Sequence, residues 1–110
     1  MPSLEIQERL NELAVKVSSI STVLDIPRMK ESISALEAEA SVPNLWDDQA
    51  NAQKVTSKLS TIQGDLRKFE SVQMRDADLP VLFELAEDAG DQDSLDEALK
   101  ELKALEAVVG

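Results

Sequence analysis

The sequence predicts an all-α protein, folded as an elongated antiparallel helical bundle with coiled-coil-like packing. Apolar residues recur at intervals of three and four along most of the chain, as they do on the buried stripe of a helix. No segment shows the alternation of a half-buried strand over any length. Short connections favour antiparallel neighbours, and a length of 110 residues predicts a single helical domain, residues 1–110.

The first two predicted helices follow each other closely. The first has an apolar seam that steps by four, three, four, three and four: Ile6, Leu10, Leu13, Val17, Ile20 and Leu24. Asp25 and Pro27 then predict a new helix, because Asp is a good N-cap residue and Pro is tolerated in a first helical turn. The same spacing continues through Ile26, Met29, Ile33, Leu36 and Ala40.

A longer helix is predicted after an interruption at "SVPNLWDD", where Pro43 disfavours helix at Val42. From Asp48 to Arg75 it would contain 28 residues. Its apolar stripe consists of Ala52, Val55, Leu59, Ile62, Leu66, Phe69 and Val72. Gly64 inside this helix costs about 1 kcal/mol relative to Ala. It indicates either a weak surface position or the close approach of another helix.

A proline and a polar turn interrupt the helical pattern of the C-terminal part. Pro80 is expected to kink or end the long helix, because proline removes a backbone donor. A short second half then carries the apolar residues Leu82, Phe83, Leu85 and Ala86. "DAGDQDS" predicts a turn, and Ser94 with Glu97 has the spacing of a capping box. The last helix is predicted from Leu95, Ala98, Leu99, Leu102, Leu105 and Val109.

The charge balance is strongly acidic. The chain has 22 Asp and Glu against 11 Lys and Arg, a net charge of −11. Such a field disfavours direct binding to nucleic-acid phosphates or to an anionic membrane. Residues 76–110 hold 11 carboxylates with only Lys100 and Lys103 as cations. This end of the chain therefore predicts a negative surface suited to a basic partner.

Little catalytic chemistry is available to this composition. The absence of Cys and His excludes disulfides, thiol nucleophiles, histidine bases and ordinary zinc sites. Paired carboxylates remain, but no sign of a pocket accompanies them. The start "MPSLEIQERL" resembles no signal peptide, and no apolar run approaches the roughly 20 residues of a membrane span. We therefore expect a cytoplasmic protein that is not an enzyme, with no catalytic residue, cofactor or metal.

The turn "DAGDQDSLDE" concentrates four acidic residues: Asp88, Asp91, Asp93 and Asp96. The turn does not match an EF-hand calcium loop. Such a loop has ligands at alternate positions, but the residue two positions after Asp93 is Leu95, and the glycine that the loop requires is missing. Acids at a helix N-terminus are favoured by the helix dipole, which is the simpler interpretation. The alternative is that these residues form a partner-binding surface.

The only tryptophan stands in a polar turn, directly before an acid pair. Asp47 and Asp48 suit the N-cap and first turn of the long helix. Trp46 precedes them, where an apolar side chain can fold over the helix start. We expect Trp46 to pack there and close the end of the bundle. The alternative is an exposed Trp that anchors a partner.

Three stretches carry a resemblance to a known family: "VLDIPRMKESISALEAEASVP", "NLWDDQANAQKVTSKLS" and "LFELAEDAGDQDSLDEALKELKALE". In their order and spacing they resemble the N-terminal domain of bacterial class I peptide chain release factors. The Trp-Asp-Asp turn, followed by Ala52 and Gln53, is the most specific part. It is closer to the release factor 2 group than to the release factor 1 group.

The resemblance implies a positional role. Release factors of this group read UGA and UAA through Ser-Pro-Phe and promote peptidyl-tRNA hydrolysis through Gly-Gly-Gln, and neither tripeptide occurs in this chain. The resemblance implies instead a docking domain that contacts the ribosome at the large-subunit stalk base, and the GTPase release factor. The alternative is a stand-alone coiled-coil scaffold or acidic regulator that self-associates through the Ile6–Leu24 seam.

Overall fold

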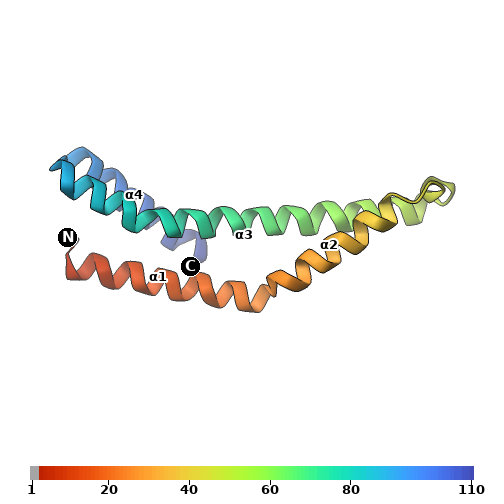
Figure 1. The fold of residues 1–110 in the computed structure, drawn as a ribbon, viewed down its shortest axis with the longest axis horizontal. Helices are drawn as coiled ribbons and strands as arrows, with labels where there is room; N and C mark the ends of the chain where they lie inside the picture. The colour runs from red at the N-terminus through yellow and green to blue at the C-terminus, as the bar shows by residue number, and fades with distance from the viewer. Residues whose placement is uncertain (1–2) are drawn as a thin grey trace. The chain divides into compact units, whose positions relative to one another are not determined.

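The computed structural model describes residues 3–110 and contains four α-helices with one short 3-10 helix (Figure 1). The elements are α1 (Leu4–Leu24), α2 (Ile26–Ala40), η1 (Leu45–Asp47), α3 (Gln49–Ala89) and α4 (Gln92–Val109). No strand occurs among the described residues. The predicted all-α class is confirmed.

The chain divides into two compact units. Unit 1 comprises the residues up to Ile20 together with Glu70–Gly110, so it contains most of α1, the C-terminal part of α3, and α4. Unit 2 is Ser21–Phe69, which contains α2, η1 and the N-terminal part of α3.

A single residue separates α1 from α2. Asp25 has a left-handed conformation, with φ of 56°, which an L-residue adopts rarely and which stops α1. Its carboxylate accepts a hydrogen bond of 3.3 Å from the Arg28 N–H, and Pro27 lies in the first turn. The restart predicted at Asp25 and Pro27 is confirmed.

α3 is longer than predicted. It runs without interruption from Gln49 to Ala89, 41 residues, so the expectation that it stops near Arg75 is wrong. Pro80 does not end it, although Pro80 has no N–H to donate to the carbonyl of Asp76. Leu79 and Phe83 on either side are completely buried. Their packing in the core offsets the missing hydrogen bond.

The turn between α3 and α4 has a different cap from the predicted one. Gly90, with φ of 61°, ends α3, and the Asp91 N–H donates to the Ala86 carbonyl while the Gly90 N–H donates to that of Glu87. This is a Schellman motif, which requires a left-handed residue. Asp91 caps α4, so the predicted capping box at Ser94 is wrong: Ser94 already lies inside the first helical turn.

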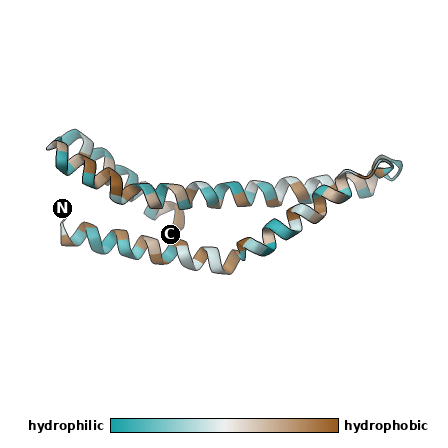
Figure 2. Cartoon of the chain, viewed as in Figure 1, coloured by the Kyte–Doolittle hydropathy of each residue, from teal (hydrophilic) through white to brown (hydrophobic). Residues whose placement is uncertain are grey.

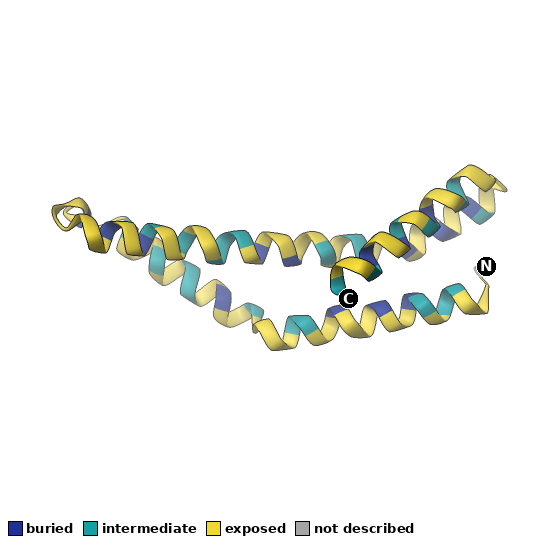
Figure 3. Ribbon diagram, turned by 180° about the vertical axis from the view of Figure 1, so that it is seen from behind, coloured by how far each residue is buried: buried dark blue, intermediate teal, exposed yellow. Residues whose placement is uncertain are grey.

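The core of unit 1 is assembled from three helices (Figure 3). The Arg9–Glu106 ion pair joins α1 to α4, and the Arg75–Glu101 ion pair joins α3 to α4. Its buried apolar side chains are Leu10, Leu13, Val17, Leu79, Phe83, Ala86, Ala98, Leu102 and Leu105. Three members of the Ile6–Leu24 seam are thus used within the chain.

The core of unit 2 is smaller, with six buried apolar side chains from α2, η1 and the N-terminal part of α3. Its buried side chains are Met29, Leu45, Ala52, Val55, Leu66 and Phe69. Hydrophobic and hydrophilic residues alternate in short bands along each of these helices (Figure 2). This is the pattern of a helix with one buried face.

Candidate partner-binding surfaces

Unit 1 carries almost the whole net charge of the chain. It has 15 carboxylates and five Lys or Arg residues, whereas unit 2 has seven carboxylates and six cations. Of the net charge of −11, unit 1 therefore contributes −10. A field of this sign attracts basic partners and speeds their encounter.

The predicted acidic residues gather at the α3–α4 turn of unit 1. The Asp91 carboxylate accepts from the Ser94 hydroxyl at 2.8 Å and from the Asp93 N–H at 3.1 Å. These hydrogen bonds, that of Ser94 first, hold the pKa of Asp91 below its ordinary value. Asp91 is thus a helix cap as well as a surface charge.

The other three acids of this turn are exposed. Asp96 accepts a hydrogen bond of 2.9 Å from the Gln92 side chain, one helical turn away. Asp88 lies at the end of α3 and Asp93 in the first turn of α4. Within residues 3–110, Asp, Glu, His and Cys side chains form no group of three placed to hold a metal ion. The arrangement is suited to electrostatic contact with a cationic surface.

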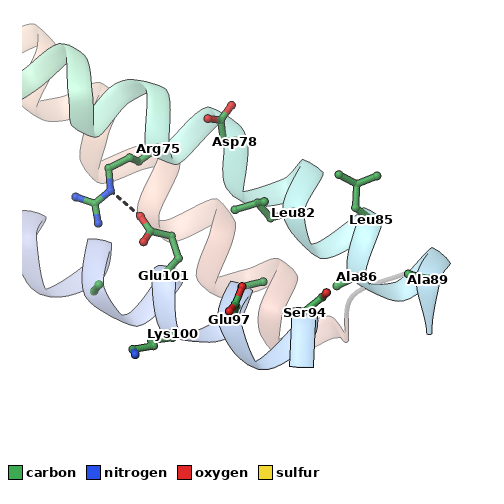
Figure 4. Close-up of a pocket in the computed structure, with 12 residues that line it drawn as sticks. Arg75, Asp78, Leu82, Leu85, Ala86, Ala89, Ser94, Glu97, Lys100 and Glu101 are labelled. Atoms are coloured by element: carbon green, nitrogen blue, oxygen red, sulfur yellow. Dashed lines mark hydrogen bonds and ion pairs between the residues drawn. The ribbon is translucent and has the colours of Figure 1, made fainter. Parts of the chain in front are cut away.

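A groove of about 900 Å³ runs between α3 and α4 in unit 1 (Figure 4). On α3 its lining steps by four, three and four: Asp78, Leu82, Leu85 and Ala89. On α4 it steps by three, four and three: Ser94, Glu97, Glu101 and Ala104. The Arg75 guanidinium donates to the Glu101 carboxylate at 2.6 Å and joins the two helices at one end.

Sequence reasoning missed this groove. It grouped Leu82 and Leu85 with Phe83 and Ala86 as one apolar segment, yet Leu82 remains 42% exposed and Leu85 61% exposed. A signal was present in the spacing: Leu79, Phe83 and Ala86 form one stripe, and Leu82 and Leu85 belong to a second stripe beside it.

The prediction that Trp46 packs over the start of the long helix is wrong. Trp46 is 59% exposed and does not close the bundle; Leu45 is buried instead, with 8% exposed. Both lie in η1, where successive side chains point about 120° apart because a 3-10 helix has three residues per turn. Only one of two neighbours can then face the core.

The acid pair after Trp46 has two different roles. Asp48 precedes α3, and its carboxylate accepts a hydrogen bond of 3.1 Å from the Asn51 N–H, so its predicted N-cap position is confirmed. Asp47 lies in η1 rather than in the first turn of α3, and its N–H donates to the Asn44 carbonyl at 3.1 Å. Asp47 and Trp46 are therefore free of the helix start and face solvent.

Comparison with protein-family models matches residues 29–109 to the PCRF domain, which is most of the chain. The chain belongs to the PCRF-domain family. None of the helices among residues 3–110 of this PCRF-domain chain has the length and apolar character needed to cross a membrane.

The relatives of the PCRF-domain chain include proteins named peptide chain release factor 2. The one from Streptomyces avermitilis is 44% identical over 105 residues, which cover 96% of this chain and 28% of the relative. The one from Mycobacterium avium is 49% identical over 105 residues, which cover 91% of this chain and 28% of the relative. The one from Corynebacterium aurimucosum is 48% identical over 101 residues, which cover 92% of this chain and 27% of the relative. The chain spans just over a quarter of their length, and the resemblance to the release factor 2 group is confirmed.

Proposed function

We propose that this PCRF-domain chain is a docking and positioning segment of a class I release factor that acts in translation termination at UGA and UAA. The observation that carries the proposal is its identity of 44–49% with release factor 2 over more than nine-tenths of the chain. The chain contains neither Ser-Pro-Phe nor Gly-Gly-Gln, so codon reading and peptidyl-tRNA hydrolysis are assigned to other parts of such a factor. This role places the segment in the cytoplasm.

The proposed partners are the stalk-base region of the large ribosomal subunit and the GTPase release factor. The acidic α3–α4 turn, with Asp88, Asp91, Asp93 and Asp96, is proposed as the surface that meets a basic ribosomal protein. It is supported by the net charge of −10 on unit 1. Direct binding to ribosomal RNA is not part of the proposal, because this charge repels phosphates.

The experiment measures binding to ribosomes of a release factor that contains this segment. Asp88→Lys with Asp93→Lys changes the surface charge and spares Asp91, which caps α4. The matched control is Glu31→Lys with Glu37→Lys on the exposed side of α2, which makes the same change in net charge. We expect the first pair to weaken binding about tenfold at low salt, and less as salt rises. Equal binding by both pairs at every salt concentration would refute the assigned surface.

The competing function, a self-associating scaffold, needs an available Ile6–Leu24 seam. Leu10, Leu13 and Val17 of that seam are buried within unit 1, which favours the docking role. The gene supplies a second test. A reading frame that continues through Ser-Pro-Phe and Gly-Gly-Gln codons is expected, whereas a stop codon directly after Gly110 would favour the scaffold.

A further inference from the structure

The α3–α4 groove of unit 1 has an open apolar floor. The buried stripe of α3 in unit 1 is Leu79, Phe83 and Ala86, and α1 lies along one side of it. There Leu10 and Asn11 of α1 border a shallow depression together with Pro80 and Glu84 of α3. The groove uses the other flank, through Leu82 and Leu85. Leu82 and Leu85 on this flank stay exposed among the described residues of unit 1.

The shape of the groove fits a helix. Its α3 side extends from Arg75 to Ala89, 15 residues, or about 21 Å at ~1.5 Å per residue. Leu82 and Leu85 line the groove from α3, and a small exposed residue, Ala104, lines it from α4. Small side chains let another backbone approach closely, and an amphipathic helix laid into an apolar groove is a common recognition mode.

The rim of the groove is acidic. Asp78 and Glu97 line it from either side, and the cationic Arg75 is neutralised by its ion pair with Glu101. Lys100 is the other cation among the lining residues. Unit 1, which contains the groove, has a net charge of −10. The groove is therefore complementary to a partner whose apolar stripe is flanked by cations.

We propose that the α3–α4 groove binds a basic amphipathic helix of a protein partner, about four turns long. The apolar side of that helix lies on Leu82 and Leu85, and its Lys or Arg residues meet Asp78 and Glu97. This inference deepens the proposed docking function and rests on it, because it specifies the form of the basic partner that the function requires.

The test uses the 110-residue chain and a fluorescent 15-residue Leu/Lys helix, with binding followed by anisotropy. Leu85→Gln removes apolar surface from the groove without changing its charge. The matched control is Val81→Gln, since Val81 is 52% exposed on the same helix and does not line the groove. We expect Leu85→Gln to weaken binding about tenfold, and Val81→Gln to leave it within about twofold. Circular-dichroism melting verifies that both variants are folded.

Two further peptides test the helical and electrostatic parts. A scrambled Leu/Lys peptide of the same charge, which has no amphipathic stripe, is expected to bind at least about tenfold more weakly. A Leu/Glu helix with the same apolar stripe is expected not to bind. If either binds as well as the Leu/Lys helix, the groove does not select a basic amphipathic helix and the proposal is wrong.

Other occupants give distinct results. A dimer in sedimentation that Leu85→Gln dissociates would assign the groove to a second copy of the chain. Binding by the 110-residue chain but not by a release factor that contains it would assign the groove to the remainder of that factor. Either result overturns the proposal. Because Asp88 and Asp93 do not line the groove, loss of ribosome binding in their Lys variants is independent of the peptide result.

Discussion

The Arg9 guanidinium of α1 donates two hydrogen bonds to the Glu106 carboxylate of α4, which lies 97 residues further along the chain. Two parallel N–H···O contacts give the pair a defined geometry as well as charge attraction. They hold the pKa of Glu106 below its ordinary value and raise that of Arg9. The pair thus links the first and last helices of unit 1.

The first prediction concerns the strength of this link. Both side chains are about one-third exposed, so solvent screening limits the coupling between them to about 0.5–1 kcal/mol. A double-mutant cycle with Arg9→Met and Glu106→Gln, followed by urea unfolding, measures it. The Arg75–Glu101 pair, with one hydrogen bond, is the comparison and should couple more weakly. A larger coupling for Arg75–Glu101 would contradict this assignment.

A second prediction concerns the pH dependence of stability. Burial raises the pKa of the Asp76 carboxyl, so its charged form destabilises the folded state above that pKa and costs nothing once it is protonated. Asp76→Asn should therefore raise the melting temperature at pH 7, with the gain disappearing as the pH falls below the ordinary Asp pKa. Melting curves between pH 3 and pH 7, about the range in which carboxylates titrate, measure this.

Glu106→Gln is a control for which the expected change in melting temperature at pH 7 has the opposite sign. Because the folded-state pKa of Glu106 is lowered, its ion pair stabilises the protein above the ordinary Glu pKa and is lost as the pH falls through the lowered value. Glu106→Gln should therefore lower the melting temperature at pH 7, and this loss should shrink as the pH falls below the ordinary Glu pKa. Parallel curves for the two variants would show that neither carboxyl is coupled to folding as described.

Much of the fold was predictable from apolar spacing. The seam of α1 and the restart at Asp25 and Pro27 depend on local periodicity and capping, which a sequence displays directly. The continuation of α3 through Pro80 was not predictable, because it depends on the burial of Leu79 and Phe83 by other helices.

The candidate surfaces were predictable only in part. The acidic residues around Asp91 could be found by counting charges, but the groove beside Leu85 could not. Periodicity identifies two adjacent apolar stripes on α3 and does not say which one a neighbouring helix covers. Likewise, the order Leu45-Trp46 does not determine which side chain faces the core, since the rotation of the 3-10 turn decides it.

A third prediction compares Leu45 with Trp46. Leu45→Ala removes a buried side chain and should lower the free energy of unfolding by about 2 kcal/mol or more. Trp46→Ala should change it by only about 0.5 kcal/mol, because the ring is mostly exposed. As Trp46 is the only tryptophan, its fluorescence should be quenched readily by iodide in the native protein. A shielded fluorophore together with a large loss in Trp46→Ala would restore the packed interpretation.

The last prediction concerns two glycines. Apart from its own turn of α3, nothing in the described chain lies within 4 Å of the position that a Cβ would occupy at Gly64, so the close helix approach considered for it is absent and a weak surface position remains. Gly64→Ala should therefore stabilise the protein by about 1 kcal/mol, the difference in helix propensity.

Gly90 is the control, since it also has open space around it but has φ of +61°. Gly90→Ala should destabilise the protein by about 1 kcal/mol, because an L-residue is strained in the left-handed region. Urea unfolding of both variants measures the two effects, which have opposite signs although neither substitution creates a clash. Destabilisation by Gly64→Ala would mean that a surface outside this chain approaches α3 at that point. Stabilisation by Gly90→Ala would mean that the α3–α4 turn does not require its left-handed residue.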